Sequence, residues 1–278
     1  MITIGERLYQ TTAPEPSLCS WESLPTPSLF HLPHLCALSL LGDNAATFLQ
    51  GQVTCDVLSI APGSAQKGAL CNLQGRVMSL FYVITQPTLM LILPHDMLET
   101  TIRALKTAAL LSGVKLQKNE ACHIYGLYHQ KACAAPDLIQ TYLLSPQQAL
   151  WLVPHTYAIE DTYNKPLESE INWHQAQLHD TEISIYSSTQ GLFLPQALDL
   201  DKKGYISFDK GCYKGQEIIA RMHYRGKRKH HLACFTYTSE TAPVLGAHHD
   251  ANTHIPHPHD IVDYCPVGPN TYLVAVIL

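Results

Sequence analysis

The chain has 278 residues, of which 46% are hydrophobic and 15% charged, and this balance predicts a soluble globular protein with one or two domains. No apolar run approaches the ~20 residues of a membrane-spanning helix, and MITIGERLYQ has neither the basic nor the apolar region of an export signal. The net charge of −5 argues against generic nucleic-acid binding by the whole chain.

The N-terminal half is predicted to be an arm followed by mixed strands and helices. Residues 1–30 are rich in Pro and Ser, which favours a loosely ordered arm. Asp43 or Asn44 offers a side-chain acceptor that caps a helix over residues 45–50. Gly51 then either ends that helix or, with its flanking amides, lines a polar pocket. We expect strands at 35–41, 114–116 and 123–127, a hairpin over 69–93 with turns at 72–75 and 86–87, and a helix over 96–111 ending at Gly113.

The C-terminal half combines short strands with irregular segments. Strands are expected on both sides of a turn at 145–148, and residues 171–178 form a short amphipathic helix. An irregular segment follows and leads to a short strand from Tyr205 to Phe208. Because strands and helices mix without a strict βαβ rhythm, the fold class is α+β. We divide the chain into the arm 1–30, a main region 31–231 and a small β module 232–278.

Cysteine and histidine usage predicts no dedicated metal site. The nine cysteines form an odd set without a C-x-x-C pair, which argues against a disulfide framework and against a zinc or iron–sulfur site built by this chain alone. We therefore expect a reducing cytoplasm. The histidine-rich stretch 248–259 could capture a metal adventitiously, but its prolines and irregular spacing favour a loop.

One stretch after Phe208 concentrates reactive groups around Cys212. Gly211 predicts a turn that carries this thiol, and apolar periodicity predicts a helix beginning near Gln216. A cysteine close to a helix N-terminus and to cations, here Lys210 and Lys214, has its thiolate favoured. The alternative is a small buried apolar residue, because free cysteines are among the most buried residue types.

The segment FLPQALDLDKKGYISFDKGCYKGQEIIARMHYRG resembles the signature region of the YgfZ family of folate-binding proteins, which are relatives of the T-protein of the glycine cleavage system. The motif K-G-C-Y-x-G-Q-E is present from Lys210 to Glu217 with no departure at a fixed position. The early loop 49–57 and the N-x-x-G hairpin over 72–77 agree with the family. The resemblance covers roughly residues 30–231 and fades in the C-terminal part.

The resemblance implies an aminomethyltransferase-like ring of three subdomains, with a small β-barrel-like C-terminal module and tetrahydrofolate or a related reduced folate in a central hole. Trp173 matches a position that lines the folate site, and a core aromatic on a helix is the alternative. Leu35 replaces a second folate-site tryptophan, and 181–183 (Thr-Glu-Ile) replaces Gly-[IFV]-Pro. The implied folate-binding residues are Trp173, Gln50, Gln52, Gln196, Tyr213, Gln216 and Glu217, beside a catalytic set of Cys212, Lys210 and Tyr213.

The hairpin after N-x-x-G decides between enzyme classes. The aminomethyltransferases carry an aspartate there that activates the folate nitrogen, whereas residues 77–81 of this chain are VMSLF, without a carboxylate. Glycine-cleavage chemistry is therefore not expected. The resemblance implies instead a folate-binding factor that supports assembly or repair of iron–sulfur enzymes, including those that modify tRNA, with Cys212 as a thiolate. Its alternatives are a folate-dependent one-carbon transferase with a relocated base and a non-catalytic adaptor without folate.

A local basic run follows the motif. No acidic residue lies between Glu217 and Glu240, whereas several cations do. They could meet the polyglutamate tail of a folate or the phosphates of tRNA. We favour a solvated strand, because charge runs usually face water and only Tyr224 adds an aromatic ring, so contact with tRNA is expected to be indirect. The cations are Arg221, Arg225, Lys227, Arg228 and Lys229.

Overall fold

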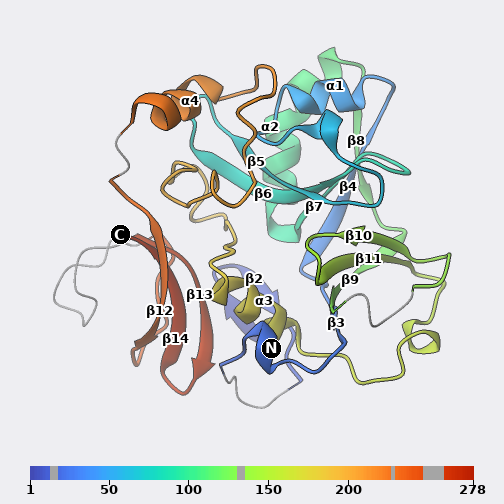
Figure 1. Cartoon of the computed structure of the whole chain (residues 1–278), viewed down its shortest axis with the longest axis vertical. Helices are drawn as coiled ribbons and strands as arrows, with labels where there is room; N and C mark the ends of the chain where they lie inside the picture. Colours follow the sequence, from blue (N-terminus) through green and yellow to red (C-terminus); the bar gives the residue numbers. More distant parts are fainter. Residues whose placement is uncertain (13–17, 130–134, 227–228, 247–259) are drawn as a thin grey trace.

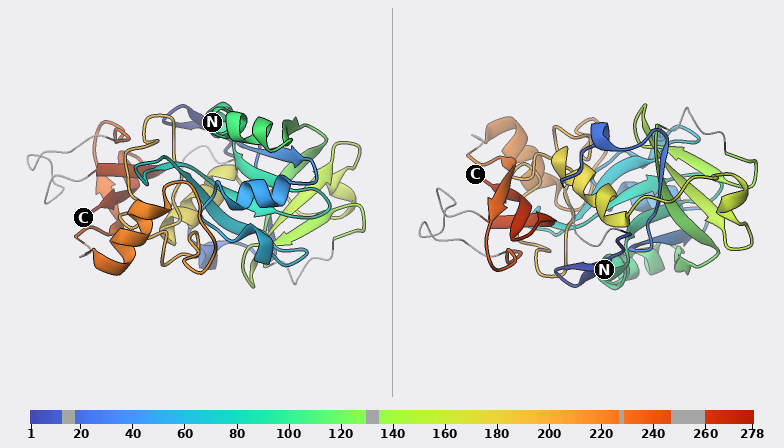
Figure 2. Two further views of the ribbon diagram at one scale, coloured as in Figure 1. Left: turned by 90° about the horizontal axis from the view of Figure 1, so that it is seen from above. Right: turned by 90° about the horizontal axis from the view of Figure 1, so that it is seen from below.

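Three antiparallel sheets lie at three corners around a shared centre in the computed structural model (Figure 1). The structure describes residues 1–278 except 13–17, 130–134, 227–228 and 247–259. Seen along two further directions, the C-terminal sheet and the sheet that contains β9 occupy opposite ends, with the sheet that contains β5 between them (Figure 2). This arrangement of mixed helices and sheets confirms the predicted α+β class and ring of three parts.

The first sheet has five strands in the order β5-β6-β7-β4-β8. Helix α2 packs on it through residues spaced at helical intervals, Leu98, Leu105 and Ala109 among them. Gly113 ends the α2 region in the left-handed conformation with φ 68°, as predicted. The elements are β4 (Leu35–Leu41), α1 (Ala45–Gln50), β5 (Gln66–Cys71), β6 (Val77–Ile84), β7 (Met90–Pro94), α2 (Leu98–Leu111) and β8 (Lys115–Asn119).

The other two large sheets have four and three strands, in the orders β10-β11-β9-β3 and β12-β14-β13. The predicted C-terminal strands are confirmed, and in the described residues they form an open three-stranded sheet. The domain borders of our division stay a prediction. The elements are β3 (Ser28–His31), β9 (Cys122–Tyr128), β10 (Gln140–Leu143), β11 (Gln148–Pro154), β12 (Leu232–Thr238), β13 (Asp260–Gly268) and β14 (Thr271–Ile277), with 3-10 turns at 21–23, 57–59, 95–97 and 159–161.

The first residues form a docked hairpin, so the prediction of a loose arm is wrong for them. Strands β1 (Ile2–Ile4) and β2 (Arg7–Tyr9) pair, and Arg7 is buried. Its guanidinium contacts Asp96 at 2.8 Å and donates to the carbonyl of Ile185 at 2.9 Å. A Pro- and Ser-rich composition describes residues 11–28, not the hairpin that precedes them.

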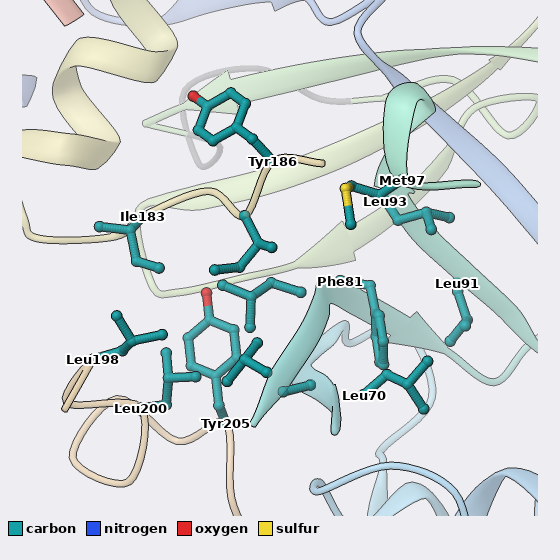
Figure 3. Packing of buried hydrophobic residues seen from close by; sticks show 14 of the residues in the cluster. Leu70, Phe81, Leu91, Leu93, Met97, Ile183, Tyr186, Leu198, Leu200 and Tyr205 are labelled. Carbon is teal, nitrogen blue, oxygen red and sulfur yellow. The ribbon is translucent and has the colours of Figure 1, made fainter. Parts of the chain in front are cut away.

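A long irregular segment links helix α3 (Glu170–His179) to helix α4 (Gln216–Arg225) and packs on the five-stranded sheet. Figure 3 shows Leu198, Leu200 and Tyr205 from this segment on one side of the buried cluster that also contains Leu70 of β5 and Phe81 of β6. The buried apolar side chains hold in place a backbone that has few regular hydrogen bonds.

Two local predictions are wrong. Asn44 precedes α1 but its side chain makes no capping hydrogen bond, and its amide instead faces the carbonyl of Ser112 at 3.5 Å. Residues 205–208 do not form a strand, because their backbone groups pair with Thr54. The Thr54 hydroxyl donates to the Tyr205 carbonyl at 2.6 Å, and the Ser207 amide donates to the Thr54 carbonyl at 3.0 Å.

Candidate functional site

A cavity lies between the five-stranded sheet, α3 and the irregular segment, and its lining includes Trp173, the residue that the resemblance implies at the folate site. Its volume is about 80 Å³. One wall is apolar and includes Leu35, Phe81 and Ile92. The polar lining residues include Gln177 and Glu182. A cavity lined by apolar side chains and a few polar groups suits a polar heterocyclic ligand.

Trp173 lines this cavity from α3, but most of its ring is enclosed by protein. The residue is only 5% exposed, and the rings of Trp21 and Phe30 meet it edge-on at centroid distances of 5.2 and 5.3 Å. Gly126 of β9 lies so close that an added Cβ would stand 2.6 Å from the indole. Trp173 is therefore a core aromatic that also forms part of the cavity wall.

Glu182 brings a carboxylate into the cavity that the sequence analysis did not assign to the site. The Lys67 ammonium donates to its Oε1 at 2.6 Å, and the Tyr205 hydroxyl donates to its Oε2 at 3.0 Å. Burial, ahead of the Glu182 charge, raises the pKa of Tyr205, so this phenol stays a donor. The signal was present as the Thr-Glu-Ile departure at 181–183, which places a charged residue where the family has an apolar one.

Two further polar groups lie in the cavity wall. The Gln177 amide nitrogen is buried, and among the described residues it has no hydrogen-bond partner. The His34 ring contacts Glu170, and burial lowers the pKa of His34. An unpartnered buried donor costs stability unless something binds it, so the Gln177 amide is available to an acceptor that enters the cavity.

The motif loop places Cys212 at the surface. Of the eight cysteines in the described residues, Cys212 alone is classed as exposed, whereas the others are buried or half-buried. The predicted helix begins at Gln216, as expected. The left-handed turn that feeds it is at Gly215, with φ 84°, and not at Gly211. An added Cβ at Gly215 would lie 2.5 Å from the carbonyl oxygen of Asn72, which explains the glycine.

The ammonium of Lys210 is bound to backbone carbonyls at the end of α1 and in the loop after it. Its role beside the Cys212 thiol stays a prediction. Lys210 is 8% exposed, and its ammonium donates to three carbonyls, those of Gln50 at 2.6 Å, Val53 at 2.8 Å and Cys55 at 2.7 Å. Burial lowers the pKa of Lys210 to about 8. This lysine therefore fixes the loop after α1, and Lys214, which is half-buried, remains as the cation beside Cys212 in the chain.

The predicted folate-binding glutamines divide between structural and unassigned positions. Gln50 donates to Asp56 at 2.8 Å and accepts from the Val57 amide at 2.7 Å, and Gln196 donates to the Ile219 carbonyl at 2.8 Å. Both side chains therefore hold the scaffold. Gln52 is half-buried.

The remaining motif residues surround the start of α4. Tyr213 is buried, and its hydroxyl has no partner among the described residues. Burial raises the pKa of Tyr213. Gln216 accepts a long 3.4 Å hydrogen bond from the Tyr213 amide, and Glu217 is exposed. The structure thus brings Gln50, Lys210, Tyr213 and Gln216 together at the motif loop, while Trp173 lines the cavity with none of them.

Neither a cluster of metal-ligating residues nor a helix able to span a bilayer is found in the part of the chain that the structure describes. No group of three or more His, Cys, Asp or Glu residues there is placed to hold a metal ion. The histidine-rich stretch 248–259 lies outside the described residues. No described helix has the length and apolarity that crossing a bilayer requires.

The fold is of the aminomethyltransferase-like class. It is similar to the crystal structure of glycine cleavage system aminomethyltransferase T from Bartonella henselae, with a TM-score of 0.60 over 90% of this chain and 78% of that chain, at 11% sequence identity. No protein-family model matches the sequence.

Curated relatives narrow this class. The "tRNA-modifying protein YgfZ" of Colwellia psychrerythraea is 31% identical over a 239-residue alignment that covers 78% of this chain and 74% of the relative. The protein of the same name from Vibrio atlanticus is 30% identical over 234 residues, covering 78% of this chain and 72% of the relative. The chain belongs to the YgfZ family.

Proposed function

We propose that this chain is a folate-binding factor that supports tRNA modification by assisting the assembly or repair of iron–sulfur enzymes, with Cys212 as its functional thiolate. The names of its relatives support the link to tRNA modification. The observation that carries the proposal is the exposure of Cys212 within a complete K-G-C-Y-x-G-Q-E motif, while the other described cysteines are buried or half-buried. An exposed thiol on a fixed loop is accessible to a partner protein.

The groups that line the cavity match a reduced folate, but the cavity is too small to hold one without rearrangement. Glu182 can accept from the N–H groups of a pterin ring, Gln177 can donate to a ring acceptor, and Trp173 supplies an apolar wall. The volume of about 80 Å³ is well below the ~300 Å³ of a small ligand pocket, so side chains such as Leu35 must move on binding. We propose Glu182, Gln177 and Trp173 as folate contacts, and Gln50 and Gln196 as residues that support the loop.

The role of the thiol is tested by complementation. A bacterial strain without its own family member receives the wild-type chain, Cys212→Ser or Cys234→Ser, and the thiomethylated fraction of its tRNA is measured by mass spectrometry. We expect Cys212→Ser to lose most of the rescue, whereas Cys234→Ser, at a half-buried cysteine, keeps it. Full rescue by Cys212→Ser would remove the proposed role of the thiol.

Folate binding is tested by fluorescence of Trp173 alone. The chain has three tryptophans, so Trp21→Phe with Trp151→Phe leaves a single emitter in the cavity wall. Titration with tetrahydrofolate is expected to quench this emission, and Glu182→Gln should weaken binding about tenfold, because a charge-assisted hydrogen bond becomes a neutral one. Calorimetry with the wild-type chain controls for the two substitutions.

Glu182 also favours a second candidate function, a folate-dependent one-carbon transferase. The hairpin over 77–81 has no carboxylate, yet Glu182 brings one to the same cavity from another element. The test is turnover of tetrahydrofolate with formaldehyde or an aminomethyl donor, measured above the uncatalysed rate. Activity that Glu182→Gln abolishes while folate still binds would favour this function over the first.

The small cavity and Leu35 favour a third candidate, an adaptor that keeps the fold without folate. Leu35 lies in the apolar wall where the family has a tryptophan, so one stacking surface is missing. No heat and no quenching on titration with tetrahydrofolate, together with intact rescue of tRNA thiomethylation, would select the adaptor.

A further inference from the structure

The outer face of α4 presents an aromatic side chain between two cations. Arg221, Tyr224 and Arg225 are spaced at i, i+3 and i+4, so their side chains are neighbours on one face of the helix. Tyr224 is 69% exposed, and both arginines are exposed. Among the described residues no hydrogen bond or ion pair engages either guanidinium. The face therefore holds two free planar cations about 6 Å apart along the helix axis.

A stack of rings holds this face against the loop that carries Cys212. Phe208, which precedes the loop, stacks on His223 of α4 at a centroid distance of 3.7 Å and an interplanar angle of 18°. Tyr224 meets His223 edge-on at 4.8 Å and Phe208 at 6.2 Å. Tyr224 is thus supported from beneath while most of its surface faces outward.

Charge continues along the chain beyond the helix. Lys229 is exposed, and the exposed His230 and His231 follow it before β12 begins. The exposed carboxylates nearby in the sequence, Asp209 and Glu217, come before the arginines, so the charge turns positive toward the C-terminal end of α4. The basic run is solvated, as predicted, because Arg221, Arg225 and Lys229 are exposed. It does not begin as a strand, since Arg225 is the last residue of α4, and residues 227–228 lie outside the described residues.

We propose that this face of α4 binds a single-stranded segment of RNA, with Arg221 and Arg225 on phosphates and Tyr224 stacked on a base. Cations that follow the backbone, combined with an exposed ring for stacking, are what single-strand binders use. An acidic peptide would need the cations but not the ring, and a membrane surface would need a wider apolar patch. This inference goes beyond the proposed function, which needs no direct contact with RNA.

The test is fluorescence anisotropy with a labelled single-stranded RNA of about 12 nucleotides and with tRNA, from about 50 to about 200 mM salt. We expect Arg221→Glu with Arg225→Glu to weaken binding at least tenfold and to reduce the salt dependence. The matched control is Arg103→Glu with Lys106→Glu, which makes the same charge change at exposed positions of α2. Tyr224→Ala should weaken binding about fivefold or more, and Tyr224→Phe should restore it.

Three results would overturn the inference. The first is that the wild-type chain does not bind RNA. The second is that the α2 control variant loses as much RNA affinity as the α4 variant. The third is that Tyr224→Ala has no effect on RNA binding and that poly-glutamate competes for the site as well as RNA does. The last result would assign the face to an acidic peptide. Each variant is first checked by thermal unfolding, and because Cys212 rescue and folate titration use other residues, failure here leaves the proposed function standing.

Discussion

The ammonium of Lys210 lies 2.8 Å from the carbonyl oxygen of Val53, one of three backbone carbonyls that accept from it at and after the end of helix α1. The carbonyl of Gln50, the last residue of α1, is a second acceptor at 2.6 Å. The final carbonyls of a helix have no partner within it, and a cation there also meets the negative end of the helix dipole. The motif lysine therefore joins the early loop to the cysteine loop.

Lys210→Met should destabilise the fold, because three buried carbonyls lose their donor. We expect the free energy of unfolding to fall by about 2 to 4 kcal/mol in urea titrations. Lys210→Arg keeps the charge but not the geometry, so its free energy of unfolding should lie between those of the wild-type chain and Lys210→Met. Wild-type stability in the methionine variant would contradict the contacts described here.

The same lysine predicts a pH window. Burial lowers its pKa from 10.5 to about 8, so between these values the unfolded chain binds a proton that the folded chain has released. The free energy of unfolding of the wild-type chain should therefore rise with pH across this window relative to Lys210→Met. Parallel pH profiles for the two proteins would show that the pKa is not lowered.

Cys212 should react first with iodoacetamide among the described cysteines. Burial raises the pKa of Cys36, Cys55 and Cys71 to about 12, which leaves little thiolate at these positions near pH 8. Peptide mapping over time measures the order of labelling. Lys214→Met should slow Cys212 labelling and Lys210→Met should not, because the Lys210 ammonium faces the carbonyls. Slower labelling in both variants would support our original prediction that both lysines favour the thiolate.

Asp263→Ala should be among the most destabilising substitutions. This fully buried carboxylate accepts from the Tyr186 hydroxyl at 2.7 Å and from the amide of Ser184 at 2.8 Å, and it lies 3.3 Å from the His174 ring. We expect a loss of about 3 to 5 kcal/mol in chemical denaturation. Tyr186→Phe, which removes one of these bonds, should cost about 1 kcal/mol.

Gly215→Ala should destabilise the protein more than the same substitution at a left-handed glycine with open space around it. A Cβ there combines a positive φ with a 2.5 Å approach to the Asn72 carbonyl. Gly63→Ala is the control, since its φ is 73° but nothing lies within 4 Å of the added atom. We expect about 1 kcal/mol of destabilisation at Gly63 and clearly more at Gly215, with faster proteolysis near Cys212. Equal costs would mean that the loop can move aside.

Most strands and helices of this chain could be predicted from the pattern of apolar residues, because alternation and helical periodicity are visible within a few neighbouring residues. Gly113 and the start of α4 at Gln216 were both predicted. What failed depends on contacts between distant segments. The burial of Arg7 needs Asp96, and the direction of Lys210 needs the loop after α1. The position of Glu182 in the cavity likewise depends on distant contacts, with Lys67 and Tyr205, and in the sequence only the departure from the family pattern at 181–183 signalled it.

The position of the hairpin β1–β2 has a consequence for the order in which contacts form during synthesis. Residues 2–9 leave the ribosome early, yet Tyr9 lies 3.4 Å from the hydroxyl of Tyr186, which in turn donates to Asp263 of β13. Contacts so distant along the chain form slowly, since their partners must first be synthesised. We therefore expect the hairpin to dock only after Tyr186 and Asp263 have been synthesised.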